Sequence, residues 1–272
     1  AAGVHDIVNS KMSDLIRQQV VRTGHLPEEF VIYAFGGAGP VHSAGFSAEL
    51  GINKIYIFPT SPVFSAFGVA AADVIHTRVI TCQYILPAQP EGPNERLNVI
   101  EKELGEAMVG EGFKADQVEF RRFFTMRYRR QTAGVEIPLP WDRLTEARLQ
   151  ELQEIFEGKY EELYGVGAGY TKAGIEISAI RVDAVGLVTK PELKPQPTEK
   201  GDGSQAVKGK RNIYFTKPER GFIETPVYDN AQLKAGNEVV GPAVLELPFT
   251  TIPVPPGACV TVDEFLNLVM EL

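Results

Sequence analysis

The sequence predicts an α/β protein whose first segment is followed by an α+β domain and a small C-terminal β-rich module. Residues 4–74 alternate helical and strand patterns, residues 79–188 combine long strand patterns with two amphipathic helices, and residues 211–272 hold short strand patterns only. We therefore expect domain limits at 1–78, 79–188 and 211–272. A stretch rich in Lys, Pro and Gly at 189–210 predicts a linker or long loop.

The first segment carries the α/β prediction. Apolar residues at helical spacing over 4–22 predict an amphipathic helix. Short β-branched and aromatic runs at 30–35 and 54–58 predict buried strands, and small apolar residues at 41–50 and 63–74 predict helices that pack closely on a sheet. The order helix, strand, helix, strand, helix indicates a unit whose strands run parallel.

The later segments have a different organisation. Within 79–188 the patterns indicate two helices on an antiparallel sheet. Within 211–272 short apolar strands alternate with turns, and no catalytic constellation is recognisable. Helical patterns cover 95–110 and 145–163, and strand patterns cover 79–86, 118–128, 135–139, 175–188, 213–215, 222–227, 243–247, 258–262 and 266–270.

Composition and charge limit the classes of partner. The 272 residues carry a net charge of −8, which disfavours nucleic acid and anionic membranes as partners. No apolar run is long enough to span a bilayer, and no signal peptide is visible. Cys82 and Cys259 lie far apart and in no metal-type spacing, so we expect a cytoplasmic protein with neither a disulfide framework nor a metal-binding cluster.

The stretch 31–42 is the first candidate for a binding site. It reads as a buried strand, a glycine-rich turn and the start of a helix. Gly36, Gly37 and Gly39 lack Cβ atoms, so the backbone can turn sharply and another body can approach closely, and Pro40 suits the first turn of a helix. Free backbone N–H groups at such a helix start favour an anion. The alternative is a tight turn that binds nothing.

Asp73 and His76 are the second candidate, because they stand three residues apart near the end of the predicted helix 63–74. On a helix they would share one face. A carboxylate and an imidazole placed in this way suit proton transfer or substrate contact. The alternative is a hydrogen bond at a helix end or a surface pair.

A cluster of arginines alternates with apolar residues in the strand pattern 118–128 and just beyond it. Arginine suits bidentate contacts with anions, so the cluster predicts an anion or phosphate clamp. The alternative is the solvated face of a strand or a subunit contact. The members are Arg121, Arg122, Arg127, Arg129 and Arg130.

The sequence lacks the other parts of a familiar catalytic site. Phosphoryl transfer needs metal-holding carboxylates and a second phosphate-cradling element. The chain contains no Walker-type motif, no Asp-Gly-Gly hairpin, no Gly-x-Ser-x-Gly elbow and no His-Glu-x-x-His motif. Taken alone, it offers half of a nucleotide site at most.

The stretch Ala34–His42 closely resembles the signature of the hydantoinase A/oxoprolinase family, which includes ATP-dependent acetone and acetophenone carboxylases. The similarity covers essentially the whole chain and keeps its order. It departs at 132–134, where family members are more polar, and at 247–249, which is more apolar than usual. The other matching segments are 8–17, 62–68, 72–76, 127–128 with Gln131, 156–165, 227–229, 241–246, 250–251 and 255–257.

The resemblance implies half of an actin/sugar-kinase-like ATPase fold. Gly36, Gly37 and Gly39 would contact the adenosine and α-phosphate side of ATP, and Phe35 and Pro40 would shape the turn. The acidic residues and phosphate hairpins of that fold belong to the N-terminal half of family members, which is absent here. The expected cofactor is therefore ATP with Mg²⁺, shared with a chain that carries the N-terminal half.

The resemblance also implies the reaction class. The leading hypothesis is a subunit of a biotin-independent, ATP-dependent ketone carboxylase that acts on a small molecule with a hydantoinase B-like partner. The alternatives are part of an ATP-dependent cyclic amide hydrolase, as in hydantoinase or oxoprolinase, and a non-catalytic scaffold subunit. His42, Asp73 and His76 are weaker candidates for residues that line the cleft, and the catalytic residues are otherwise unassigned.

Overall fold

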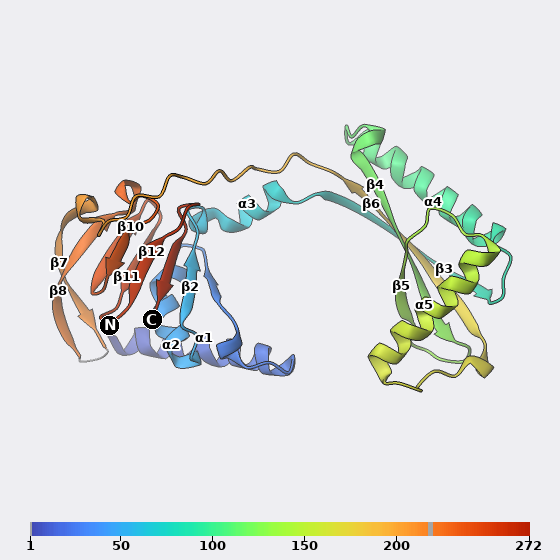
Figure 1. The fold of residues 1–272 in the computed structure, drawn as a ribbon, viewed down its shortest axis with the longest axis horizontal. Coiled ribbons are helices and arrows are strands. Elements are labelled where there is room, and N and C mark those ends of the chain that lie inside the picture. The colour runs from blue at the N-terminus through green and yellow to red at the C-terminus, as the bar shows by residue number, and fades with distance from the viewer. Residues whose placement is uncertain (1, 217–219) are drawn as a thin grey trace. The chain divides into compact units, whose positions relative to one another are not determined.

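The computed structural model describes residues 2–216 and 220–272 and divides into two compact units (Figure 1). The first unit joins Ala1–Ala70 to Pro191–Leu272, and the second unit is Ala71–Lys190. The β-rich module expected at 211–272 therefore does not stand apart, because its strands complete a sheet begun by the first segment.

That sheet has five strands in the order β1-β2-β13-β12-β9. β1 (Ile32–Ala34) and β2 (Lys54–Ile57) are parallel, as predicted. β13 (Leu268–Glu271) pairs antiparallel with β2 and with β12 (Cys259–Val262), and β12 pairs antiparallel with β9 (Glu238–Val240). The expected limit between 1–78 and 211–272 is thus crossed by backbone hydrogen bonds between β2 and β13.

The second sheet of the first unit has the order β11-β10-β8-β7. It consists of β7 (Val207–Phe215), β8 (Gly221–Asp229), β10 (Ala243–Leu247) and β11 (Thr250–Val254). β7 begins inside the expected linker 189–210, whose earlier part is extended and exposed. Apolar side chains of both sheets form one core, which includes Ala34, Ile55, Ile57, Leu245, Ile252, Val254, Val260, Leu268 and Met270.

Two helices of the first unit pack on each other. α1 (Ala2–Arg22) and α2 (Gly39–Leu50) confirm the helices expected at 4–22 and 41–50. Phe46 and Leu50 of α2 are buried and pack with apolar residues of α1. At Gly45 the helices come so close that an added Cβ would lie 2.8 Å from Cγ of Asn9.

The prediction of a helix over 63–74 is wrong at its C-terminal end. α3 covers Phe64–Ala71, and β3 covers Val74–Ile85, which also begins before the strand expected at 79–86. β3 pairs antiparallel with β6 (Ile175–Gly186) along almost its full length. The backbone hydrogen bonds of this pairing make residues 74–78 part of a strand rather than of a helix. The expected domain limit at 78/79 consequently falls within a single strand.

The second unit is the α+β domain that the sequence predicts. Its antiparallel sheet has the order β3-β6-β4-β5, with β4 at Val118–Tyr128 and β5 at Val135–Leu139. α4 (Glu91–Gly110) and α5 (Glu146–Tyr164) cover one face of this sheet (Figure 1). Their shared core includes Leu97, Ile100, Met108, Phe124, Met126, Ile137, Leu152, Phe156, Ile177, Ile180 and Val182.

Short 3₁₀ turns connect several elements. Within the described residues, no helix is both long and apolar enough to cross a membrane. The 3₁₀ turns lie at Pro27–Glu29, Ser61–Val63, Ala115–Gln117, Thr171–Ala173, Ser204–Ala206 and Asn230–Gln232.

Candidate functional site

The glycine turn connects β1 to α2, as the sequence predicts. Gly36 has a φ of 80°, a left-handed conformation that favours glycine, and its N–H donates to the carbonyl of Ser61 at 2.7 Å. α2 begins at Gly39, and Pro40 lies buried in its first turn. The first N–H groups of a helix have no partner within the helix, so the turn presents donors at its end.

Ser61 fixes the base of the turn, a role that the sequence analysis missed. Its hydroxyl donates to the carbonyl of Ala34 at 2.9 Å and accepts from the N–H of Phe58 at 2.8 Å. Ser61 thereby joins the C-terminal ends of the parallel strands β1 and β2. In open α/β sheets, ligands bind outside that end of the strands.

The space in front of the turn is open. A Cβ atom added to Gly36 or Gly39 would meet nothing within 4 Å, and one added to Gly37 would meet only the carbonyl of Phe249, at 3.7 Å. Gly37 and Gly39 do not adopt positive φ angles, so neither backbone strain nor crowding within the described chain requires glycine there. A turn that omits side chains without internal need is suited to close approach by another molecule.

Thr250, the first residue of β11 in the second sheet, contacts the glycine turn. Its hydroxyl donates to the carbonyl oxygen of Gly37 at 2.8 Å. The neighbouring Phe249 is 76% exposed, and Phe35 on the other side of the glycines is 48% exposed. Two aromatic side chains with free surface therefore adjoin the glycine turn, one from each sheet. The sequence offered no local signal for this meeting, because the segments are 213 residues apart.

His42 lies in the first turns of α2 and contacts α1. Its Nδ1 lies 2.9 Å from Oδ1 of Asn9, and its ring stacks on His5 with centroids 4.8 Å apart. Burial, followed by the charge of His5, lowers the pKa of His42. These contacts give His42 a place in the packing of α1 on α2, and its predicted role in lining a cleft stays a prediction.

Asp73 and His76 do not share a helix face, because β3 begins between them. Asp73 accepts from the N–H of Val188 at 3.0 Å and from Nζ of Lys190 at 2.6 Å, and the hydrogen bond from Lys190 is the main cause that lowers its pKa. His76 Nε2 lies 2.8 Å from a carboxylate oxygen of Glu111. The structure gives each of them a separate partner within the second unit rather than a joint site.

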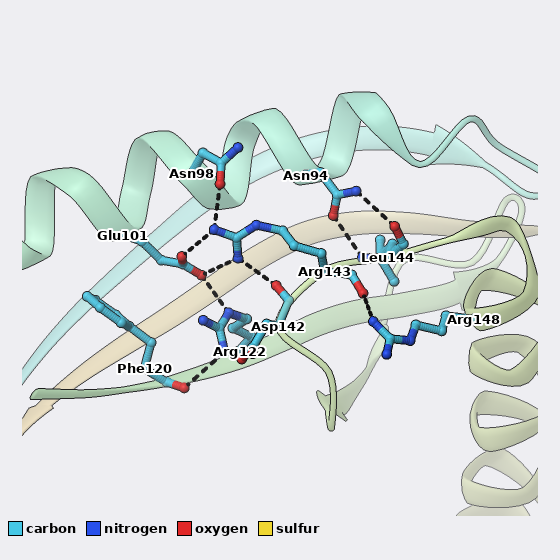
Figure 2. A network of polar contacts seen from close by, with 9 residues as sticks. All are labelled: Asn94, Asn98, Glu101, Phe120, Arg122, Asp142, Arg143, Leu144 and Arg148. Atoms are coloured by element: carbon cyan, nitrogen blue, oxygen red, sulfur yellow. Dashed lines mark hydrogen bonds and ion pairs between the residues drawn. The ribbon is translucent and has the colours of Figure 1, made fainter.

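Two of the clustered arginines are engaged by carboxylates. Figure 2 shows Arg122 and Arg143 sharing the carboxylate of Glu101, which lies on α4. Arg122 also contacts Asp142 at 3.0 Å. Arg127 donates to Glu176 at 2.8 Å. The guanidinium groups of Arg122 and Arg127 thus already hold protein anions, and these contacts favour the structural alternative over a phosphate clamp for both.

An open pocket of about 1130 Å³ in the first unit is lined by residues of α1, α2, β7 and β8 and by the segment that runs from the end of β11 to residue 258. Its walls are mostly apolar and include Val41, Phe222 and Pro255. The polar and charged lining residues are His5, Asp6, Asn9, Glu49 and Thr216. Val41 lies two residues beyond Gly39, but Gly36, Gly37 and Gly39 are not among the residues that line the pocket. His42, Asp73 and His76 are not among its lining residues.

The family of the chain follows from its domains. A family model described as hydantoinase/oxoprolinase matches residues 1–78, and one described as the hydantoinase/oxoprolinase C-terminal domain matches residues 94–271. Together they account for most of the chain, so it belongs to the hydantoinase/oxoprolinase family. This confirms the resemblance noted in the sequence.

Two of the similar proteins are subunits of carboxylases. The chain is 30% identical to the acetone carboxylase beta subunit of Xanthobacter autotrophicus over 94% of its own length and 37% of the relative. It is also 30% identical to the acetophenone carboxylase gamma subunit of Aromatoleum aromaticum, over all of its own length and 38% of the relative. The chain therefore spans less than two fifths of these proteins.

Solved structures agree with the sequence comparison. The nucleotide-free structure of acetone carboxylase superposes with a TM-score of 0.86 and 28% identity, over 99% of this chain and 39% of that one. The ATP-dependent caprolactamase of Pseudomonas jessenii superposes with a TM-score of 0.71 and 23% identity, over 99% of this chain and 39% of that one, which shows a shared fold alone.

Proposed function

We propose that this chain contributes the adenosine side of the ATP site in a biotin-independent, ATP-dependent ketone carboxylase. The observation that carries the proposal is the open cradle at Gly36, Gly37 and Gly39, at the carboxyl ends of two parallel strands. The 30% identity to subunits named for acetone and acetophenone carboxylation supports the reaction class. Acetone and related small ketones are the proposed substrate class.

The residues present fit a nucleotide. Backbone N–H groups at the start of α2 can donate to phosphate oxygens, and the absent side chains of Gly37 and Gly39 leave room for them. The exposed rings of Phe35 and Phe249 offer apolar surface to a planar base. Bound ATP would supply the phosphoryl group that activates an unreactive oxygen of the substrate or of bicarbonate.

The chain alone does not complete such a site. Within the described residues there is no group of three or more His, Cys, Asp or Glu side chains that could hold a metal ion. We propose that Mg²⁺ and the phosphate tail are held by the polypeptide that corresponds to the rest of the relatives, on an actin/sugar-kinase-like fold of which the parallel β1–β2 pair and the glycine turn are one half. A hydantoinase B-like subunit is the proposed partner for the carboxylation step.

A second candidate is ATP-dependent hydrolysis of a cyclic amide. The chain is 25% identical to a 5-oxoprolinase of Arabidopsis thaliana over its whole length. Both reactions begin with ATP-dependent activation of a carbonyl or enolate oxygen, so the glycine cradle serves either. The two functions are distinguished by measuring ATP hydrolysis by the assembled enzyme with a ketone and with a lactam. Stimulation by the ketone indicates the carboxylase, and stimulation by the lactam indicates the cyclic amide hydrolase.

The test of the nucleotide role is Gly37→Val in the assembled enzyme. The added side chain would project into the open space in front of the turn, so we expect ATP hydrolysis to be abolished while assembly is unchanged. The control is Gly209→Val, which places the same side chain in open space on strand β7 of the same unit. Unchanged ATP hydrolysis in the Gly37 variant would remove the proposed role of the turn.

A further inference from the structure

Five of the six edge strands among the described residues are protected against pairing with another chain. β1 and β9 have three residues each, and the five-residue strands β5 and β11 contain Pro138 and Pro253. β7 has nine residues and carries Lys208, Lys210 and Arg211. Short length, proline and closely spaced positive charge each disfavour the addition of a further strand.

β3 is the sixth edge strand, and it lacks these protections. It has twelve residues and no proline, and its only lysine or arginine is Arg78. Among the described residues, β3 pairs with β6 alone, so its other side has no strand beside it. Val79, in the middle of the strand, is 57% exposed, and Ile75 and Ile85 are exposed as well. A long, unpaired edge with exposed apolar side chains is a template for pairing with a strand of another chain.

The basic side chains of β3 are turned toward α4. Nε of Arg78 lies 3.9 Å from a carboxylate oxygen of Glu103 on α4. Nε2 of His76 lies 2.8 Å from a carboxylate oxygen of Glu111, which directly follows α4. Arg78 and His76 therefore lie on the helix-covered face of the sheet, and side-chain alternation places Val79 on the opposite face. A strand that approaches β3 along the sheet meets no row of charges like that of β7.

A second copy of this chain can supply the neighbouring strand. Two antiparallel copies of one strand that continue one sheet are related by a two-fold axis perpendicular to the sheet, and each copy presents the same residues to the other. Directly opposite residues share a face of the sheet, so the axis must pass between a residue and its own copy. An axis at Arg78 or His76 would place two identical basic side chains opposite each other, and an axis at Thr77 would place Arg78 opposite His76.

An axis at Val79 avoids these unfavourable pairs. Val79 then lies opposite Val79 of the second copy, and Thr77 lies opposite Thr81, and such pairs of β-branched residues favour strand pairing. Arg78 lies opposite Ile80, so the two guanidinium groups do not face each other. The register of β3 on β6 is regular up to Thr81 and irregular beyond it, so an axis farther along the strand would bring the irregular part into the pairing.

We propose that β3 pairs antiparallel with β3 of a second copy of this chain, about a two-fold axis at Val79. The pairing joins the four-stranded sheets of the two second units into one continuous antiparallel sheet, with α4 and α5 of both copies on the same face. The new backbone hydrogen bonds satisfy the free N–H and C=O groups on the edge of each β3. The interface lies within the second unit and goes beyond the proposed nucleotide role, which belongs to the first unit.

Disulfide crosslinking in the assembled enzyme, which contains the remaining family polypeptide, tests this interface and its register. Val79→Cys would place two thiols opposite each other at the axis, with Cα atoms about 4.5–5.5 Å apart, which a disulfide can span. Thr77→Cys and Thr81→Cys would place thiols opposite each other only when the two variants are co-expressed in one assembly. The oxidised products are separated without reductant, and mass spectrometry identifies the linked peptides.

We expect linked pairs of the chain for Val79→Cys, and for the co-expressed threonine variants, at roughly tenfold the yield of the controls, because thiols held opposite each other have a high effective concentration. Either threonine variant expressed alone should stay at the control level, since its thiol would lie roughly 13 Å along the strand from its own copy. The controls are the wild type, with Cys82 and Cys259, and Leu163→Cys on α5, where the native side chain is 55% exposed and so as accessible as that of Val79.

Three results would overturn the proposal. They are a yield for Val79→Cys at the control level, equal yields for the threonine variants expressed alone and together, and a disulfide that joins position 79 to a different polypeptide. The readout does not depend on ATP. Failure of the crosslinks would therefore leave the proposed role of the glycine turn intact, and unchanged ATP hydrolysis in Gly37→Val would leave this interface intact.

Discussion

Thr250 and Gly37 are joined by a hydrogen bond from the threonine hydroxyl to the glycine carbonyl oxygen, 2.8 Å long, across 213 residues of sequence. Thr250 is the first residue of β11, and Gly37 lies in the turn that opens α2. The bond therefore fixes the glycine turn to the second sheet of the first unit. A turn held at two successive residues, Gly36 by Ser61 and Gly37 by Thr250, is pre-organised for a ligand.

The first prediction concerns this bond. Thr250→Val keeps the shape but removes the donor, and a neutral hydrogen bond of this kind contributes about 1 kcal/mol, so ATP should bind roughly five- to tenfold more weakly. Thr250→Ser keeps the hydroxyl and should bind ATP nearly as the wild type does. Calorimetry of nucleotide binding to the assembled enzyme measures the difference. Equal affinities for the Val and Ser variants would show that this bond does not position the turn for nucleotide.

Sequence patterns located correctly those strands and turns whose structure depends on neighbouring residues in the sequence. β5 was expected at 135–139 and is found at Val135–Leu139, because alternate residues face the helices and the solvent. The glycine turn was also predicted correctly, because the signal for it is local: three glycines lie between a strand pattern and a helix pattern. The α3–β3 boundary was not, since Ala70–Ala72 suit a helix and the strand that follows depends on pairing with β6, about a hundred residues away.

Long-range pairing also explains the errors in domain limits and in the candidate site. Residues 211–272 contain ordinary strand patterns, and nothing in them indicates that β13 pairs with β2. Ser61 falls between the strand predicted at 54–58 and the helix predicted at 63–74, and Thr250 belongs only to a segment that carries the family resemblance. Their roles arise from tertiary contacts with Ala34 and Gly37, which no spacing in the sequence encodes.

The second prediction concerns the ionic network of the second unit (Figure 2). Glu101 accepts from Arg122 and Arg143, and the side chains of Glu101 and Arg122 are each only 11% exposed. Glu101→Ala would leave a nearly buried guanidinium without its main partner, so we expect the free energy of unfolding to fall by about 3 kcal/mol. Urea denaturation measures this loss.

The matched control is Glu103→Ala on the same helix. Glu103 forms an exposed pair with Arg78 at 3.9 Å, and such pairs contribute between 0 and about 1 kcal/mol. Equal losses in the two variants would mean that the burial of the Glu101 network adds nothing to its strength.

The third prediction is a pH dependence at Glu176. The hydrogen bond from Gln83, and then that from Arg127, hold the pKa of this buried carboxyl below its usual value of about 4.3. A depressed pKa stabilises the fold above the unfolded pKa, and the stabilisation is lost as the pH falls through the folded pKa. The advantage of the wild type over Glu176→Gln should therefore be constant above about pH 5 and shrink below pH 4.

Denaturant titrations of wild type and variant at several pH values between 3 and 7 provide the measurement. Glu192→Gln serves as the control, because Glu192 is exposed and lies 3.9 Å from Lys194 in the loop after β6. A difference between wild type and Glu176→Gln that stays the same from pH 7 to pH 3 would contradict the assignment.

The fourth prediction concerns the contact between α1 and α2. A Cβ at Gly45 would overlap the side-chain amide of Asn9, which is buried and hydrogen-bonded to His42 at 2.9 Å. Gly45→Ala gains up to about 1 kcal/mol of helix propensity, but overpacking costs about 1–3 kcal/mol, so the variant should be less stable than the wild type.

A double-mutant cycle isolates this contact. Asn9→Ala removes the overlapping atoms and also the bond to His42, so it should destabilise the protein when introduced alone. In the double variant the new methyl group occupies space vacated by Asn9, and the helix propensity gain is then realised. We therefore expect the double variant to be at least about 1 kcal/mol more stable than the sum of the single effects predicts. Additive single effects in the denaturation experiment would mean that α1 moves away from α2 instead, and that the close approach at Gly45 does not fix the position of the helix that follows the glycine turn.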